Sequence, residues 1–198
     1  MSHLAPVVDP TLLPVHALLP VHALLPGARV ATEDGALRAD RLVAGMRLRG
    51  RGGWRVLRAV TRVEPSAAAR AARPGLRTCV IPADALAPGV PSRDLPLAAG
   101  APLVAEPGAT IPASALAAAG LARIDQAPAP LLRLRLDRPD AVAADGVWVA
   151  MGPLADRTAL PPAALAAMPP AALRAALRRA NAGAVLNRLC CGGALSVA

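Results

Sequence analysis

The sequence predicts an all-β domain of antiparallel hairpins followed by a short helical tail. Two observations predict the sheet: apolar residues alternate with arginine along several stretches, and Asp-Gly or Gly-rich turns separate these stretches. A third predicts the tail, where prolines precede a run of alanine, leucine and arginine. The chain of 198 residues contains no Phe and no Tyr, so its core must consist of Leu, Val, Ile, Ala and two Trp.

Residues 1–22 are predicted to form a repetitive leader. The letters LLPVHALLPVHALLP repeat a six-residue unit, which places prolines at Pro14, Pro20 and Pro26. Prolines at this spacing exclude a regular helix, so we expect an extended segment. His16 and His22 recur in step and could share one face of a strand, but no third ligand lies nearby. We therefore expect a duplicated low-complexity leader and no metal site.

The β domain is predicted over residues 23–150, and it opens with a hairpin. The letters RVATEDGALR predict two strands with a turn at Asp34–Gly35, and Thr32 is assigned to the same hairpin. A second pair of strands follows around a turn at Gly50–Gly53. The arginines that alternate with apolar residues in this pair are expected to form its solvated face. They are Arg47, Arg49, Arg55 and Arg62.

Shorter elements are predicted in the Ala- and Pro-rich middle of the chain. Strands are expected at residues 77–81 and 103–104, and a short helix at residues 114–119. The alternating letters LLRLRLDR predict another strand, and a further strand pair is expected around Asp145–Gly146. We expect the β-rich part to end near Ala150.

Residues 151–198 are predicted to form the tail. Prolines at first-turn positions followed by strong helix formers predict a helix from about Pro170 to Ala180. Leu173 and Leu177 would share one face of this helix, with Arg174 and Arg178 as its polar flank. We expect residues 190–193, Cys-Cys-Gly-Gly, to belong to a loose end.

The charge permits binding of a polyanion. All 22 basic residues are arginine, against 13 acidic residues, which gives a net charge of +9. The group Arg47, Arg49, Arg51, Arg55 and Arg58 is one candidate surface for an acidic protein or a nucleic acid. A coding bias toward arginine and a solvated strand face are the simpler explanations. A nucleic-acid surface would also interleave aromatic rings, of which only Trp54 is available.

Other residue types point to structural roles. Cys79 lies in the apolar run TCVI and is expected to be buried and inert, and the three cysteines lack metal-ligand spacing. Asp137, Asp140 and Asp145 do not match a calcium loop and are assigned to turns and salt bridges. Trp54 and Trp148 are expected to pack in the core or at a sheet edge. No cofactor is expected.

The start of the chain and its hydropathy bear on location. No basic region precedes the first apolar stretch, so we expect no classical signal peptide and, by default, a cytoplasmic protein. Proline or charge interrupts every long apolar stretch, and we therefore expect no membrane span.

The letters LLPGARVATEDGALRADRLVAGMRL resemble the opening of bacterial Hint domains, the hedgehog/intein self-processing family. Pro26–Gly27 match the family's Pro-Gly turn, and Leu42 and Gly45 match its Leu-x-x-Gly step, with Met46 in place of the usual Asp. The segment 85–97 resembles the approach to the family's Ser-Pro-x-His block, and segments from residues 111 and 134 resemble later strands. The resemblance covers residues 24–150 and implies a compact, disc-like fold and self-cleavage or splicing without a cofactor.

The same resemblance implies that the catalytic groups are missing. The nucleophile position falls on Ala23, the block's Ser on Ala98 and its His on Ala101. A methyl group cannot attack a carbonyl, and His22 beside it could act only as a base. The expectation is a degenerate Hint domain without self-processing. An Arg-rich interaction module and a relic without selected activity stay open as alternatives.

Overall fold

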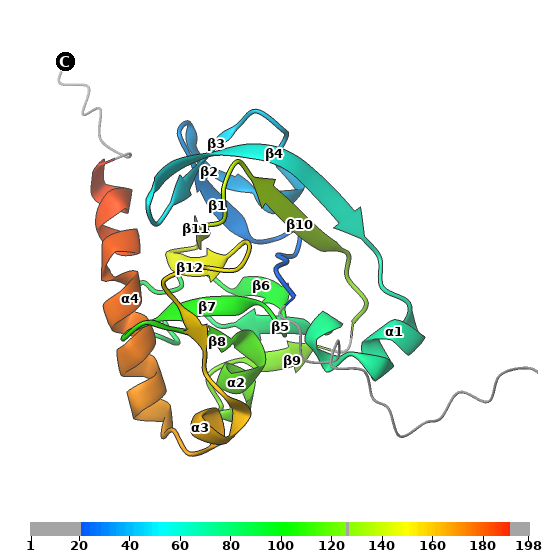
Figure 1. Ribbon diagram of the computed structural model, residues 1–198, viewed down its shortest axis with the longest axis vertical. Coiled ribbons are helices and arrows are strands. Elements are labelled where there is room, and N and C mark those ends of the chain that lie inside the picture. Colours follow the sequence, from blue (N-terminus) through cyan, green and yellow to red (C-terminus); the bar gives the residue numbers. More distant parts are fainter. Residues whose placement is uncertain (1–20, 126, 191–198) are drawn as a thin grey trace, which may run out of the picture.

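The computed structural model describes residues 21–125 and 127–190. In this part of the chain, ten strands form one curled sheet in the order β10-β4-β3-β1-β11-β12-β7-β8-β13, with β2 paired to β1 (Figure 1). The strands of this sheet are β1 Arg29–Thr32, β2 Gly35–Arg38, β3 Arg47–Gly50, β4 Gly53–Val63, β7 Pro102–Ala105, β8 Ala109–Pro112, β10 Leu131–Leu136, β11 Ala141–Ala144, β12 Val147–Ala150 and β13 Thr158–Ala159.

A smaller sheet and a set of helices complete the described fold. The second sheet has the order β6-β5-β9, from β5 Thr78–Ile81, β6 Leu95–Ala98 and β9 Arg123–Asp125. The α-helices are α1 Ala67–Ala72, α2 Ala113–Ala118, α3 Pro162–Ala166 and α4 Pro170–Cys190. Strands predominate and nearly all pair with antiparallel neighbours, so the predicted all-β class is confirmed.

The two Asp-Gly pairs form different turns. At Asp145–Gly146 both residues have positive φ, 47° and 87°, which is the backbone of a type I′ turn, and this turn joins β11 to β12 as expected. The first hairpin turns one residue earlier than expected, at Glu33–Asp34. Gly35 takes a φ of 110° and already begins β2, where its carbonyl accepts a 2.6 Å hydrogen bond from the Thr32 hydroxyl.

The short central elements lie close to where they were predicted. The strand expected at residues 77–81 is β5, the pair 103–104 lies inside β7, and the short helix is α2, one residue earlier than expected. The β-rich part was predicted to end near Ala150, but one short strand follows that residue. β13 lies beyond that point and pairs in parallel with β8, because the chain folds back along the outer edge of the sheet.

The predicted C-terminal helix is confirmed, but it is longer than the predicted range of about Pro170 to Ala180. α4 continues to Cys190, so the prediction that this cysteine belongs to a loose end is wrong; residues 191–193 lie outside the described part. Leu173 and Leu177, which were predicted to share one face of the helix, are both buried. Tertiary contacts stabilise the continuation of the helix. One of them is a 2.7 Å hydrogen bond that the Asn181 side chain accepts from the Trp148 backbone amide. Figure 1 shows α4 running along the side of the sheet beside β12 and β7.

The core divides into two groups of buried side chains. The larger one lies within the curl of the sheet and is built mainly from leucine, valine and alanine. The smaller one lies under α4, where Trp148 packs with Val104, Ala180 and Ala184. The predicted core position of Trp148 is thus confirmed, since its side chain is buried. Among the described residues, no helix combines the length and the apolar character that a membrane crossing needs.

One arginine of the predicted solvated face is buried. Arg55 is only 9% exposed, and its Nε lies 2.7 Å from a carboxylate oxygen of Asp140. The prediction was wrong here because a buried acid from a distant loop neutralises the guanidinium. By contrast, Arg47 and Arg62 are exposed, as the alternation predicted.

Candidate functional site

The segment of residues 21–25 lies between the two sheets and connects them. The Leu24 amide donates to the Leu132 carbonyl at 3.0 Å, and the Leu132 amide donates back at 2.8 Å. On its other side Leu24 forms a bridge with Leu97 of β6. This short stretch therefore pairs with β10 and β6 at once, and Figure 1 shows it at the centre of the molecule, in dark blue.

Ala23, Ala98 and Ala101 come together at this segment. The Ala98 amide donates to the Ala23 carbonyl at 3.2 Å, and the Ala101 amide donates to the Ala98 carbonyl at 2.9 Å. All three residues are fully buried. The structure therefore brings Ala23 into one hydrogen-bonded group with Ala98 and Ala101, which lie about 75 residues further along the chain.

The turn beside these alanines is tightly closed. The Val21 amide donates to the Gly100 carbonyl at 3.1 Å, and the Gly100 amide donates to the Gly75 carbonyl at 2.9 Å. A Cβ added at Gly100 would lie 3.2 Å from the Gly75 Cα and 3.2 Å from the Val21 Cγ2. This closeness explains the glycines at both positions, because a side chain at either would push the turn away from the segment.

His22 is held in one tautomer beside Ala23. Its Nδ1–H donates a 2.9 Å hydrogen bond to the Ala150 carbonyl, at the end of β12. Burial lowers the pKa of His22, Arg133 lowers it further, and the bond to Ala150 opposes both. The imidazole is therefore neutral near pH 7, with Nε2 as its basic nitrogen.

A cleft of about 470 Å³ opens beside His22, bordered by β10 and by residues 151–153. Arg133 and Arg135 contribute positive charge to its lining. Thr61 contributes the only hydroxyl among its lining residues, all of which belong to the described part of the chain. The cleft therefore contains one base and one weak nucleophile, and no thiol or carboxylate lines it.

The cysteine of β5 lies in the core near the three alanines. Cys79 is fully buried, and its Sγ–H donates to the Ala113 carbonyl at 3.6 Å. Burial raises the pKa of its thiol to about 12, so the thiolate is scarce at neutral pH. The preceding residue, Thr78, lies opposite Ala98, but its hydroxyl donates to the Ala127 carbonyl at 3.4 Å. The predicted burial of this cysteine is confirmed.

The five arginines of the candidate polyanion surface do not act as one free group. Arg47 pairs with Glu33 at 2.9 Å, Arg51 pairs with Asp156 at 3.1 Å, and Arg55 is buried against Asp140. Arg47 and Arg49 also lie over the half-exposed ring of Trp54, at 6.0 and 5.6 Å from its centroid. Among the five, Arg49 and Arg58 lack a carboxylate within 4 Å in the described part of the chain.

The three acidic residues of the later strands have the structural roles predicted for them. Asp137 accepts from the Val56 amide at 3.2 Å, and Asp140 accepts from the Gly52 amide at 3.1 Å in addition to its pairing with arginine. Asp145 accepts from the Arg29 amide at 2.9 Å. These bonds fix the turns around β11.

Two features of the site escaped prediction from the sequence. The contact of His22 with Ala150 joins residues 128 positions apart through a backbone carbonyl, which has no signature in the sequence. Arg174 and Arg178 were predicted as a polar flank, but they also line a cleft against the loop of residues 84–88. Only their spacing of four residues hinted at a shared helix face.

The chain is similar to one sequence-family model and to several solved structures. A sequence model of the Hint domain matches residues 22–150. Among solved structures, the gp41-1 intein is similar with 11% identity and a TM-score of 0.44, over 64% of this chain and 96% of that one. The MchDnaB-1 intein is similar with 13% identity and a TM-score of 0.43, over 66% of this chain and 100% of that one. No curated protein matches the chain in sequence. Since the Hint sequence model covers more than half of the chain, this protein belongs to the Hint domain family.

Proposed function

We propose that this chain is a Hint domain that keeps the scaffold of an autoprocessing family and has lost self-processing at the His22–Ala23 peptide bond. The observation that carries the proposal is the chemistry of Ala23, Ala98 and Ala101. They are buried together, and each presents a methyl group where the family resemblance places a nucleophile, a hydroxyl or an imidazole.

Residue 23 of this chain has no atom that could attack in the first step of self-processing. In that step an oxygen or sulfur of residue 23 attacks the carbonyl carbon of His22. The ester or thioester bond forms as the carbon–nitrogen bond breaks, and the proton of the nucleophile passes to the released nitrogen. The Cβ of Ala23 has no lone pair, so no base can start this sequence.

The neighbouring side chains do not replace the missing groups. His22 is neutral and is anchored to Ala150, which leaves it a base without a nucleophile at the junction. The Cys79 thiol stays protonated at neutral pH. Its S–H group donates a hydrogen bond to the Ala113 carbonyl. Thr61 shares the cleft of His22 and is the one hydroxyl there, so it is the residue to remove in a test.

The alanines themselves suit a scaffold. Each lies in the apolar core, and their backbone hydrogen bonds hold the segment of residues 21–25 against β6. Small side chains at these positions avoid burying unpaired polar groups, each of which costs about 1–3 kcal/mol. Loss of the reaction thus removes a reason to keep polar groups in the core.

The experiment follows the intact mass of the full chain during incubation with dithiothreitol or hydroxylamine. We expect the 20.0 kDa species to persist, because no acyl intermediate forms for either reagent to cleave. A fragment that begins at Ala23 would contradict the proposal. If such a fragment disappeared in Thr61→Ala, the hydroxyl of the cleft would be its source.

A pair of variants tests the proposal by introducing a thiol at the junction and, as a matched control, elsewhere in the core. Ala23→Cys places a thiol at the junction, whereas Ala144→Cys places one at an equally buried alanine of β11. We expect cleavage by hydroxylamine after His22 in the first variant only. Equal behaviour of the two variants would argue that the scaffold no longer presents this peptide bond for attack.

A further inference from the structure

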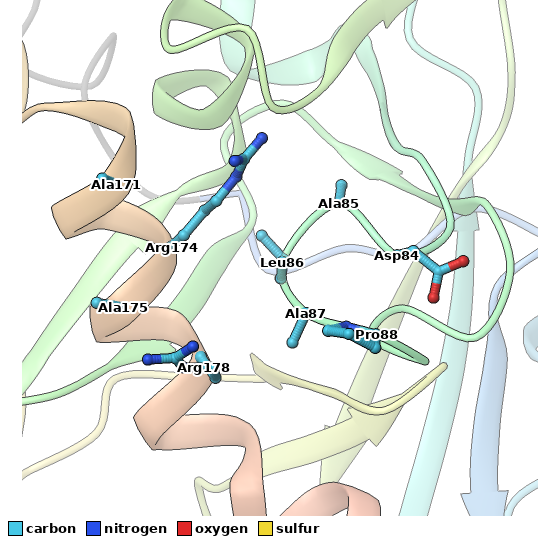
Figure 2. A pocket seen from close by; sticks show the side chains of 9 residues that line it. All are labelled: Asp84, Ala85, Leu86, Ala87, Pro88, Ala171, Arg174, Ala175 and Arg178. Atoms are coloured by element: carbon cyan, nitrogen blue, oxygen red, sulfur yellow. The ribbon is translucent and has the colours of Figure 1, made fainter.

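A cleft between α4 and the loop after β5 lies outside the proposed function. Its walls are the loop of residues 84–88 and the face of α4 that carries Ala171, Arg174, Ala175 and Arg178 (Figure 2). Its volume is about 430 Å³, which lies in the range of small binding sites. We call it the α4 cleft.

The helix wall of the α4 cleft carries two arginines without acidic partners. Arg174 and Arg178 are four residues apart, so their side chains lie one helical turn apart on one face. Both are exposed, and no carboxylate in the described part of the chain lies within 4 Å of either guanidinium. Each therefore retains its donors for a ligand.

The loop wall is apolar and is held by hydrogen bonds within the loop. The amides of Leu86 and Ala87 donate to the Val90 carbonyl at 3.0 and 3.2 Å. Leu86 is buried, and Figure 2 shows the side chains of Leu86 and Ala87 directed toward the helix. The loop therefore presents a fixed apolar surface opposite the arginines.

The one carboxylate among the lining residues is occupied within the loop. Asp84 accepts a hydrogen bond from the Gly89 amide, and Figure 2 shows its side chain turned away from α4. Its backbone has a φ of 60°, a conformation that this internal bond helps to hold. Asp84 thus leaves the positive charge of the helix wall uncompensated.

The two walls favour different side chains of one extended ligand. Successive side chains of an extended peptide point to opposite sides, and residues two apart are about 6.5–7 Å apart. Side chains four apart on a helix have a similar spacing, about 5–6 Å between Cβ atoms. An extended peptide in the cleft would therefore place alternate residues against the two arginines and the intervening residues against the apolar loop.

We propose that the α4 cleft binds an extended acidic segment of a partner protein, in which Asp or Glu alternates with apolar residues. Guanidinium groups pair with carboxylates in charge-assisted, often bidentate, hydrogen bonds. The intervening apolar side chains cover Ala87 and Pro88, which are partly or fully exposed in the loop wall. The net charge of +9 accelerates the encounter with such a segment.

The test uses the full chain and fluorescence anisotropy of a labelled peptide, Glu-Leu-Glu-Leu-Glu, with Gln-Leu-Gln-Leu-Gln as the uncharged probe. Binding should favour the acidic peptide and weaken as salt increases. The double variant R174Q/R178Q should weaken binding by about tenfold or more, because both charge-assisted pairs are lost. The matched control R41Q/R138Q removes the same charge from two exposed arginines elsewhere and should change binding less than about twofold.

A second variant locates the site without removing an arginine. Ala87→Glu places a carboxylate on the loop wall, where it would pair with the helix arginines and displace an acidic ligand. Its Kd for the acidic peptide should therefore rise by about tenfold as well.

Several results would overturn the proposal. They are no binding of the acidic peptide, equal binding of the neutral peptide, or equal loss in the R41Q/R138Q control. Tighter binding of a single-stranded oligonucleotide that is also lost in R174Q/R178Q would overturn the choice of partner. Each outcome is independent of self-processing, since none involves Ala23.

Discussion

The buried pair Arg55–Asp140 offers a quantitative test of how this fold is held together. We consider Asp140→Ala, which removes the acid and leaves the guanidinium in place. The side chains of Arg55 and Asp140 are only 11% and 10% exposed, and Nε lies 2.7 Å from the carboxylate. The variant therefore leaves a positive charge almost without solvent or partner.

The expected cost follows from what Asp140 contacts. Removing one partner of a buried ion pair costs about 3–5 kcal/mol, because the remaining charge stays uncompensated. Asp140 also accepts from the amides of Gly52 and Ala141, at 3.1 and 2.8 Å, and those bonds are lost too. We take about 3–5 kcal/mol as the loss in the free energy of unfolding, since Arg55 keeps its bond to the Trp54 carbonyl.

Urea unfolding followed by tryptophan fluorescence measures this loss. With a slope of about 2 kcal/mol per molar urea, the midpoint should fall by about 1.5–2.5 M. The control is Glu64→Ala, which breaks the pair of Arg62 and Glu64, whose side chains are 59% and 69% exposed. Its midpoint should move by less than about 0.5 M, because exposed pairs contribute little.

A double variant separates the buried charge from packing. Arg55→Met combined with Asp140→Leu removes both charges, so its midpoint should recover toward that of the unmodified chain. A midpoint for Asp140→Ala no lower than that of Glu64→Ala would refute the reasoning. So would a double variant less stable than Asp140→Ala alone.

Three further predictions concern single side chains. Burial raises the pKa of Cys79 to about 12, so in a variant without the other two cysteines the native thiol should resist a disulfide reagent at pH 8 until urea unfolds the chain. The folded state keeps this proton longer than the unfolded state, so above about pH 9 the free energy of unfolding should fall by up to about 1.4 kcal/mol per pH unit, a slope absent in Cys79→Ala; an identical slope in that variant would disprove the assignment. Burial lowers the pKa of His22, so its contribution to stability should be complete above pH 6.5 and be lost at more acidic pH, and an imidazole titration by NMR at or above 6.5 would contradict this. Leu177→Ala should destabilise the chain by about 2–5 kcal/mol in urea, whereas the exposed Arg178→Ala should change stability by less than about 0.5 kcal/mol, and equal effects would mean that α4 does not pack as described.

The strands were predictable where one side of the sheet faces water. In β10 the leucines are buried while Arg133 and Arg135 are exposed, so a period of two in the sequence reports the burial directly. The same reasoning failed at Arg55, because periodicity carries no information about an acid contributed by a distant loop. Burial of a charge depends on its partner, and the partner is a property of the tertiary fold.

The helical tail shows a second limit of local signals. Proline and helix formers predicted the start of α4 correctly, but not its continuation to Cys190. Contacts beneath the helix support that continuation, among them the bond of Asn181 to the Trp148 amide. Packing against a sheet outweighs local propensity, and the sequence of a helix does not state what it packs against.

The candidate site could be predicted only through family resemblance. Alanine has no functional group, so no motif or spacing marks Ala23, Ala98 and Ala101 as related. Their hydrogen-bonded contact follows from the position of residues 21–25 between β6 and β10. The carbonyl of Ala150 that holds His22 is equally invisible in the sequence.

The most direct test of the central claim is the intact mass of the freshly purified chain with a short affinity tag at each end. Self-processing during expression would remove one tag before any incubation begins. The account predicts a single species with both tags, because residue 23 has no attacking atom. A species that begins at Ala23 would contradict the account and would show that another residue performs the attack.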